Sequence, residues 1–193
     1  MHTKPRYKIC VSGAAETEHC GKDTFVIAEE LGREIVRHGC VLIEGATTGF
    51  PFWVAKGAKE EGGIVVGFSP AVSEKEHIDV YNLPTDYHDI IVYTGFNYSG
   101  RNLLLTRAAD AVVVGCGRMG TLNEFTIAFE DRKPIGILEG SWGTDETLRA
   151  LIQKSHRAEE MKNKIVYAKD PKTLLDGLIK VIEQEKKNNN HYL

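Results

Sequence analysis

The sequence contains no C-x-x-C pair, no long apolar run and no marked excess of charge of one sign. Its cysteines are spaced unlike those of a zinc site or a disulfide framework, so we expect reduced thiols at Cys10, Cys20, Cys40 and Cys116. No segment approaches the ~20 apolar residues that a membrane helix needs, and residues 1–8 lack the apolar part of a signal peptide. These absences predict a cytoplasmic protein that does not enter a membrane.

The charged residues are balanced and well mixed along the chain. There are 24 Lys and Arg against 27 Asp and Glu, which gives a formal net charge of −3. A duplex nucleic acid would need a wide cluster of basic side chains, so no nucleic-acid partner is expected. A single phosphate group needs only backbone amides and one arginine. The seven histidines are scattered, so we predict no metal site and no bound cofactor.

Short β-branched runs alternate with helical patterns along most of the chain. Strands are predicted at residues 7–12, 40–44, 63–68, 90–93, 111–115, 134–138 and 164–168. Helices are predicted at residues 23–38, 51–61, 99–109, 121–131, 145–156 and 171–185, and residues 69–89 are predicted to cross the surface without regular structure. The order indicates one α/β domain over residues 1–185, with a doubly wound, mostly parallel, Rossmann-like sheet and helices on both faces. A polar, disordered tail is expected at residues 186–193.

A glycine-rich loop, Gly115-Cys-Gly-Arg-Met-Gly120, joins a predicted buried strand to a predicted helix. In a doubly wound sheet the ligand lies beyond the carboxyl ends of the strands, where the strand order reverses. Glycine allows a tight turn and a close approach of ligand to backbone, and the helix start offers free N–H groups and positive dipole charge. The loop is therefore a candidate phosphate site, although a simple strand-to-helix turn would have the same composition.

The same glycines also match the dinucleotide-binding fingerprint G-x-G-x-x-G. Glu139 lies near the end of the next predicted strand, where a ribose-binding acid belongs. The fingerprint normally follows the first strand of its domain, however, and here several other strands come before it. An NAD-binding module remains an alternative.

Two charged side chains flank the loop. Thr121 and Glu124 have the spacing of a capping box, with Thr121 as N-cap of the following helix. Glu124 lies off the apolar face of that helix, so it need not be buried and would stay near the ligand edge. Arg101 begins the preceding helix, and its guanidinium matches phosphate in geometry. A purely structural cap at Glu124 and a solvated Arg101 are the plainer interpretations.

These motifs resemble a known family. The segments Gly100-Arg101, Gly117-x-x-Gly120-Thr121-Leu-x-Glu124 and Arg132-Lys-Pro-Ile-Gly-Ile-Leu138 are similar to the LOG ("Lonely Guy") family, and so are Ile9-Cys-Val-Ser-Gly13 and Glu44-Gly45-Ala-Thr-Thr-Gly49. Characterised members are cytokinin riboside 5′-monophosphate phosphoribohydrolases, once mislabelled lysine decarboxylases. Three positions depart from the family pattern: Asn102 replaces a lysine, Cys116 a proline and Arg118 a glycine. The Gly-Arg-Asn version is closer to the branch that includes molybdenum-cofactor carrier-like proteins.

The resemblance implies hydrolysis of the N-glycosidic bond of a nucleoside 5′-monophosphate, releasing base and ribose 5-phosphate. Glu124 and Arg101 would be catalytic. Phosphate and nucleotide contacts would come from Gly117, Arg118, Met119, Gly120, Thr121, Ser12, Gly13, Gly45, Thr47 and Thr48. The departures favour an alternative, a non-catalytic carrier of a nucleotide or phosphorylated cofactor. The family resemblance also implies a homodimer or a larger homo-oligomer.

Overall fold

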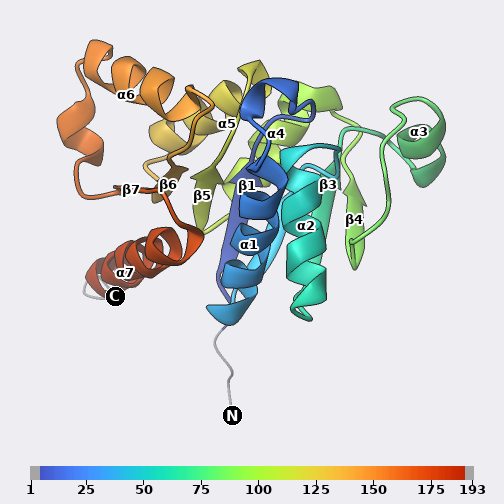
Figure 1. Ribbon diagram of the computed structural model, residues 1–193, viewed down its shortest axis with the longest axis horizontal. Coiled ribbons are helices and arrows are strands. Elements are labelled where there is room, and N and C mark those ends of the chain that lie inside the picture. Colours follow the sequence, from blue (N-terminus) through green and yellow to red (C-terminus); the bar gives the residue numbers. More distant parts are fainter. Residues whose placement is uncertain (1–4, 190–193) are drawn as a thin grey trace.

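The computed structural model describes residues 5–189, which form a seven-stranded sheet flanked by helices (Figure 1). Every strand pair is parallel, and the strand order is β4-β3-β2-β1-β5-β6-β7. The strands are β1 (Lys8–Ser12), β2 (Val41–Glu44), β3 (Val65–Ser69), β4 (Ile90–Tyr93), β5 (Ala111–Val114), β6 (Ile135–Leu138) and β7 (Ile165–Ala168). This arrangement confirms the predicted doubly wound, Rossmann-like fold.

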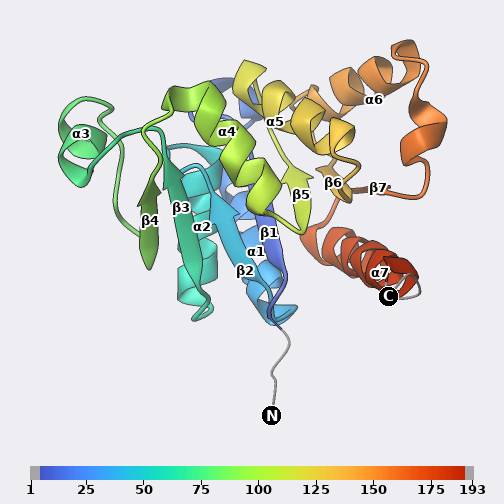
Figure 2. The same ribbon diagram turned by 180° about the vertical axis from the view of Figure 1, so that it is seen from behind.

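Helices cover both faces of the sheet, and each face has its own apolar core. One face is packed against α1 (Thr24–Arg37), α2 (Phe50–Glu60) and α7 (Pro171–Asn189). The other is packed against α4 (Asn97–Ala108), α5 (Met119–Glu130) and α6 (Thr144–Lys154), as the view from behind shows (Figure 2). Because both faces are covered, β5 and β6 are buried at every position, which explains their unbroken apolar sequences.

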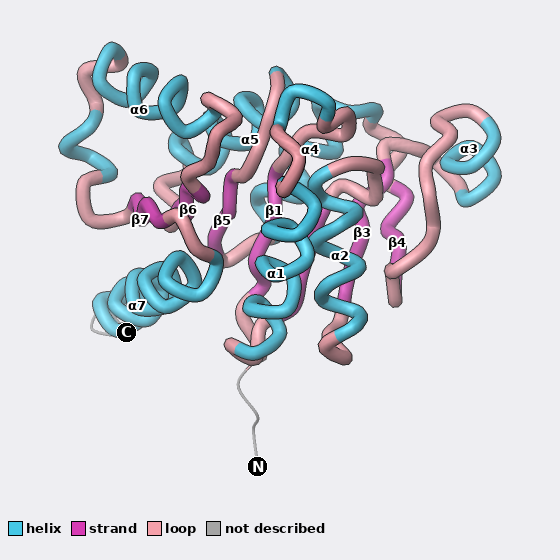
Figure 3. The backbone as a smooth tube through the Cα atoms, viewed as in Figure 1, coloured by secondary structure: helices cyan, strands magenta, loops and turns pink. Residues whose placement is uncertain are grey.

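The segment after β3 contains a helix that the sequence patterns did not predict. Residues Glu74–Asp79 form α3, which stands apart from the sheet beyond β4 (Figure 3). His77 of α3 is fully buried, with Nδ1 2.8 Å from the Ser69 hydroxyl and Nε2 3.0 Å from the Pro84 carbonyl oxygen. These bonds connect the excursion to the end of β3, so this segment is anchored rather than irregular throughout.

The last helix extends beyond its predicted end. α7 continues to Asn189, so part of the expected disordered tail is helical, and residues 190–193 lie outside the described residues. The Lys186 ammonium lies 3.1 Å from a carboxylate oxygen of Asp110 and 4.2 Å from the centre of the Tyr7 ring. These contacts join the end of α7 to residues that flank β1 and β5. Between residues 5 and 189, no helix combines the length and the apolar character needed to cross a membrane.

The expectation of four reduced thiols was wrong for one pair. Cys20 and Cys116 form a disulfide, with their Cα atoms 5.7 Å apart, while Cys10 and Cys40 are free and buried. The two partners are 96 residues apart in sequence. They meet because β1 and β5 are neighbours in the sheet, so the loops that follow these strands lie side by side. Cysteine spacing alone carries no sign of such a contact.

Candidate functional site

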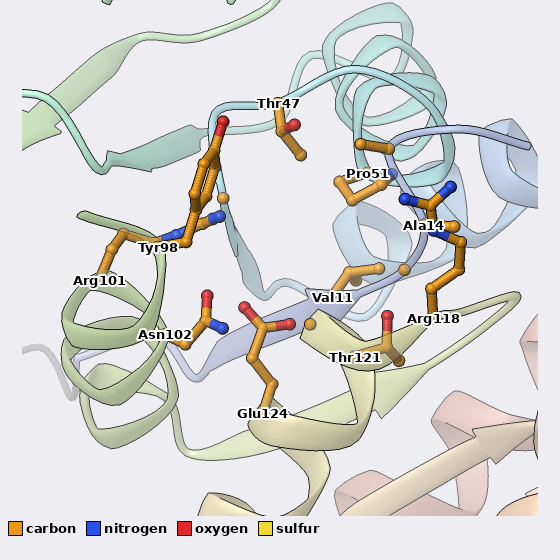
Figure 4. Close-up of a pocket in the computed structure, with 14 residues that line it drawn as sticks. Val11, Ala14, Thr47, Pro51, Tyr98, Arg101, Asn102, Arg118, Thr121 and Glu124 are labelled. Atoms are coloured by element: carbon orange, nitrogen blue, oxygen red, sulfur yellow. The ribbon is translucent and has the colours of Figure 1, made fainter. Parts of the chain in front are cut away.

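A pocket of about 310 Å³ opens where the strand order reverses, between the carboxyl ends of β1 and β5 (Figure 4). Its walls come from the loops after β1 and β2 and from the N-terminal parts of α2, α4 and α5. The predicted site residues that line it are Gly13, Gly45, Thr47, Arg101, Arg118, Gly120, Thr121 and Glu124. Residues that line it without having been predicted are Val11, Ala14, Ala15, Pro51, Tyr98 and Asn102. The pocket therefore occupies the position at which Rossmann-like sheets bind their ligands.

Arg101 supplies the buried positive charge of the pocket. The residue is only 6% exposed, and its Nε atom is buried without a hydrogen-bond partner in the part of the chain that the structure describes. The guanidinium carbon lies 5.9 Å from the centre of the Tyr98 ring, one helical turn earlier on α4. A side chain at position 45 would overlap the guanidinium, so Gly45 makes room for Arg101. A buried cationic group with an unsatisfied donor is an energetically costly arrangement that an anionic ligand would relieve.

Glu124 is the acidic group of the pocket, and it is buried, contrary to the expectation that it need not be. It is 7% exposed, and its Oε2 accepts a hydrogen bond from the Ser12 hydroxyl at the end of β1. Burial raises the pKa of the Glu124 carboxyl, and the charge of Arg101 and the Ser12 hydrogen bond only partly oppose this. The pocket therefore combines a permanent cation with a carboxyl group whose pKa is raised.

The predicted capping box was wrong. Helix α5 begins at Met119 with Arg118 as its N-cap residue, so Thr121 lies inside the first turn. Thr121 instead fills the space that a side chain at Gly117 would need. Glu124 is consequently free of a capping role, and its carboxyl group points into the pocket with Thr121 beside it (Figure 4). The helix start is shifted because the turn from β5 uses only four residues, 115–118.

The three glycines of the loop have different roles. Side chains at Gly115 and Gly117 would collide with Phe50 and Thr121, respectively, and the Gly117 amide donates to the Thr144 hydroxyl (2.9 Å). Those two glycines therefore serve internal packing. A Cβ atom at Gly120, in contrast, would meet nothing within 4 Å, and Gly120 lines the pocket. A ligand can therefore approach the backbone of this loop at Gly120, its last residue.

The start of α5 borders the same pocket through Gly120 and Thr121. The first hydrogen bond of this turn runs from the Leu122 amide to the Arg118 carbonyl oxygen (3.0 Å). The amides of residues 119–121 precede it and have no acceptor four residues back within the helix. Together with the helix dipole they form an anion-binding element. Arg118 extends the positive rim, where its exposed side chain pairs with Glu16.

Four predicted contact residues do not line the pocket. Gly117 is turned toward Thr144, and Met119 is 77% exposed and borders a separate hollow. The Thr48 hydroxyl donates to the Ala15 carbonyl oxygen (3.1 Å), so it connects the loop after β2 to the loop after β1. Ser12 acts on the pocket indirectly, through its bond to Glu124.

Of the residues behind the dinucleotide interpretation, Gly120 lines the pocket, whereas Gly115, Gly117 and Glu139 do not. Glu139, its candidate ribose-binding acid, pairs with Arg149 and does not line the pocket. The fingerprint uses its second glycine for the close approach of a pyrophosphate, and here that glycine, Gly117, faces Thr121.

A second buried acid was not among the predicted site residues. Glu44 ends β2 and is fully buried; its Oε1 accepts from the Ala46 amide (2.9 Å) and pairs with Nε2 of His88. Its Oε2 has no partner among residues 5–189. Burial lowers the pKa of His88, but the hydrogen bond and charge of Glu44 outweigh this and raise it overall. The position of Glu44, at the carboxyl end of a strand just before a glycine loop, was the available signal.

The fold and this pocket define a Rossmann-like protein with its ligand site at the switch point of a parallel sheet. The chain belongs to the SLOG cluster4 family, whose model matches residues 6–175. This agrees with the resemblance to LOG and carrier-like proteins seen in the motifs. An uncharacterized protein of Archaeoglobus fulgidus is 33% identical over 132 residues, which cover 68% of this chain and 80% of that protein.

Solved structures of similar fold include proteins named for a cofactor. The molybdenum cofactor binding protein of Rippkaea orientalis is 26% identical, with a TM-score of 0.72 over 93% of this chain and 99% of that one. The molybdenum cofactor carrier protein of Chlamydomonas reinhardtii is 24% identical, with a TM-score of 0.71 over the same shares of the two chains. At that identity the second match speaks for the fold alone.

Proposed function

We propose that this protein binds a phosphorylated small molecule, a nucleotide or a phosphorylated cofactor, and holds its phosphate between the start of α5 and Arg101. The observation that carries the proposal is the buried, unpartnered Nε of Arg101 in a pocket that also contains the first amides of α5. A phosphate monoester would accept hydrogen bonds from both sources, and such charge-assisted bonds are roughly twice as strong as neutral ones.

A carrier or binding protein is the form of this function that we favour. The similar protein of Rippkaea orientalis is named for binding the molybdenum cofactor, a ligand of the proposed class. Asn102 also supports this form, because it stands where the hydrolytic relatives have a lysine. It is 5% exposed, and its side-chain amide donates to Asn123 (2.9 Å). Because asparagine is neutral, it adds no charge to the pocket. The volume of about 310 Å³ lies at the lower end of the range for small-molecule sites.

Hydrolysis of a nucleoside 5′-monophosphate is the second candidate, and Glu124 is the observation that favours it. In that reaction water adds to C1′ of the ribose while the bond from C1′ to the base nitrogen breaks. Glu124 would take a proton from the water, or return one to the departing base. A carboxyl group with a raised pKa suits this exchange, because proton transfer is most effective when the pKa approaches the working pH.

Two measurements test the binding proposal. In calorimetric titrations with AMP, adenosine and inorganic phosphate, we expect AMP to bind at least about tenfold more tightly than adenosine, since one charge-assisted bond is worth ~1.5–3 kcal/mol. Arg101→Gln should remove the difference between AMP and adenosine. Arg107→Gln is the matched control, because Arg107 lies on the same helix but pairs with Asp131 at the surface. Equal affinity for AMP and adenosine in the unmodified protein would contradict the proposal.

The two candidate functions are separated by turnover. The protein is incubated with AMP, GMP, CMP and UMP, and free base and ribose 5-phosphate are quantified by chromatography. Binding without release supports the carrier. Release that disappears in Glu124→Gln, with AMP affinity retained, supports the hydrolase.

We also infer a homodimer, on the basis of exposed apolar side chains gathered at α4. Phe96, Tyr98, Leu103 and Leu104 are 38–64% exposed; Phe96 directly precedes the helix that carries Arg101, and the other three lie on it. Sedimentation should give twice the monomer mass, and Leu104→Glu should give the monomer. A monomeric unmodified protein would contradict this.

A further inference from the structure

A cluster of three potential metal ligands lies outside the pocket, where the loop after β1 meets the loop after β5. His19 and Cys20 belong to the short 3-10 helix Glu18–Cys20, and Cys116 precedes α5. Nε2 of His19 is 3.7 Å from Sγ of Cys20 and 3.5 Å from Sγ of Cys116. Both cysteines are buried, whereas His19 is exposed.

The distances from His19 to the two sulfurs match those between ligands of a metal site, and a disulfide does not require them. Thiolate sulfur and imidazole nitrogen are the ligands that zinc prefers, at about 2.3 and 2.0 Å from the metal. In a tetrahedral site such bond lengths place a nitrogen and a sulfur ligand about 3.5 Å apart. Both distances from His19 to the sulfurs are already close to this value. The two sulfurs, bonded to each other in the disulfide, must in addition move apart to about 3.8 Å to bind the same metal.

We propose that His19, Cys20 and Cys116 bind a thiophilic divalent cation, with Zn²⁺ as the reference ion, when the disulfide is reduced. A dithiol reductant supplies two electrons, the S–S bond breaks, and the reductant itself becomes a disulfide. The two thiols lose their protons as the cation binds both sulfurs and the neutral Nε2 of His19. In the reverse direction a small-molecule disulfide accepts two electrons, the S–S bond re-forms, and the cation is released.

The surrounding structure allows this exchange without separating the two loops. The Ala14 amide donates to the Cys116 carbonyl oxygen (2.7 Å), so a backbone hydrogen bond joins the segments independently of the sulfurs. Within residues 5–189 the cluster has three protein ligands, and the exposed side of His19 leaves the fourth position to water. Three protein ligands and a water are the pattern of an open zinc site.

Cobalt titration tests the proposal, because tetrahedral Co²⁺ bound to thiolates has characteristic d–d and sulfur-to-metal charge-transfer absorption. Protein reduced under anaerobic conditions, with the reductant then removed, should bind one equivalent of Co²⁺, and Zn²⁺ should displace it. The oxidised protein should bind none. His19→Ala should weaken binding at least about tenfold, the loss that even an outer-shell partner can cause. Cys20→Ser should abolish the charge-transfer absorption of a two-thiolate site.

Cys40→Ser is the matched control, because Cys40 is a free buried cysteine whose neighbouring histidine, His38, bonds to Glu34 and Asp176. It should bind Co²⁺ as the unmodified protein does. Since His19 is exposed, His19→Ala should fold normally, which circular dichroism of the reduced form checks. The proposal is overturned if reduced protein binds no Co²⁺, if oxidised protein binds it equally, or if His19→Ala and Cys40→Ser have the same affinity.

Discussion

Replacing Gly120 by alanine should change ligand affinity and the stability of the free protein in opposite directions. A Cβ atom at this position meets no protein atom within 4 Å, so the substitution causes no collision. Gly120 is the second residue of α5, and alanine is favoured over glycine in a helix by up to about 1 kcal/mol. For a domain of this length that corresponds to a rise in Tm of roughly 2–4 °C. The free variant should therefore be as stable as the unmodified protein, or more stable.

The bound state should respond in the opposite way. The added methyl group projects into the pocket beside the first amides of α5, where we place the phosphate. Losing one charge-assisted hydrogen bond costs about 1.5–3 kcal/mol, which raises Kd roughly 10- to 150-fold. Calorimetry with AMP measures the affinity, and thermal unfolding without ligand measures the stability.

Gly117→Ala provides the contrast, since its methyl group would collide with Thr121 and should lower the stability of the free protein. A Gly120→Ala variant that binds AMP normally, or that is destabilised without ligand, would contradict these expectations. Normal binding would place the phosphate away from α5. Destabilisation would mean that the space beside Gly120 is not open.

Three further predictions concern the charges around the pocket. Gly45→Ala should displace the Arg101 guanidinium and raise Kd for AMP about tenfold, the loss of one charge-assisted bond, with little change for adenosine in the same calorimetric titration. The pKa of Glu124 is raised by burial. Its contribution to stability is therefore complete below its unfolded-state pKa of about 4.3 and is lost as the pH rises through the pKa of the folded protein. Glu124→Gln should reduce this loss of stability, as measured by urea unfolding between pH 4 and 8. The pKa of His88 is also raised, by Glu44, so stability should fall again as the pH rises above about 6.5 and through the folded value. His88→Gln should remove that second fall, and an unchanged pH profile in either variant would show that the named group does not cause it.

Much of the fold could be predicted because the periodic patterns are strong. All seven strands and six of the helices were predicted close to their observed positions, since apolar runs and helical faces alternate regularly. The exception among the α-helices is α3, six residues with mostly polar side chains. Helices this short have no stability of their own and depend on tertiary contacts. Here the contact is His77, whose burial no local pattern indicates.

The site was only partly predictable, for reasons of geometry. Arg101 and Glu124 were recognised from their motifs, and both line the pocket. The role of Gly115 was misread, because its packing against Phe50 depends on a residue from another helix. The disulfide was missed for the same reason, since Cys20 and Cys116 meet only after β1 and β5 have paired. The spacing of residues along the sequence does not indicate contacts between distant segments.

The central position of β1 has a consequence for how the chain folds. One edge of β1 pairs with β2, with Ile9 opposite Leu42. The other edge pairs with β5, which comes much later in the sequence, and there Ile9 lies opposite Ala111. During synthesis the first half of the sheet therefore emerges with an apolar strand unpaired along one side. Closing this long loop is entropically slow, so folding should be slower than in a chain built from local contacts. A fragment ending before β5 would expose that edge and should aggregate.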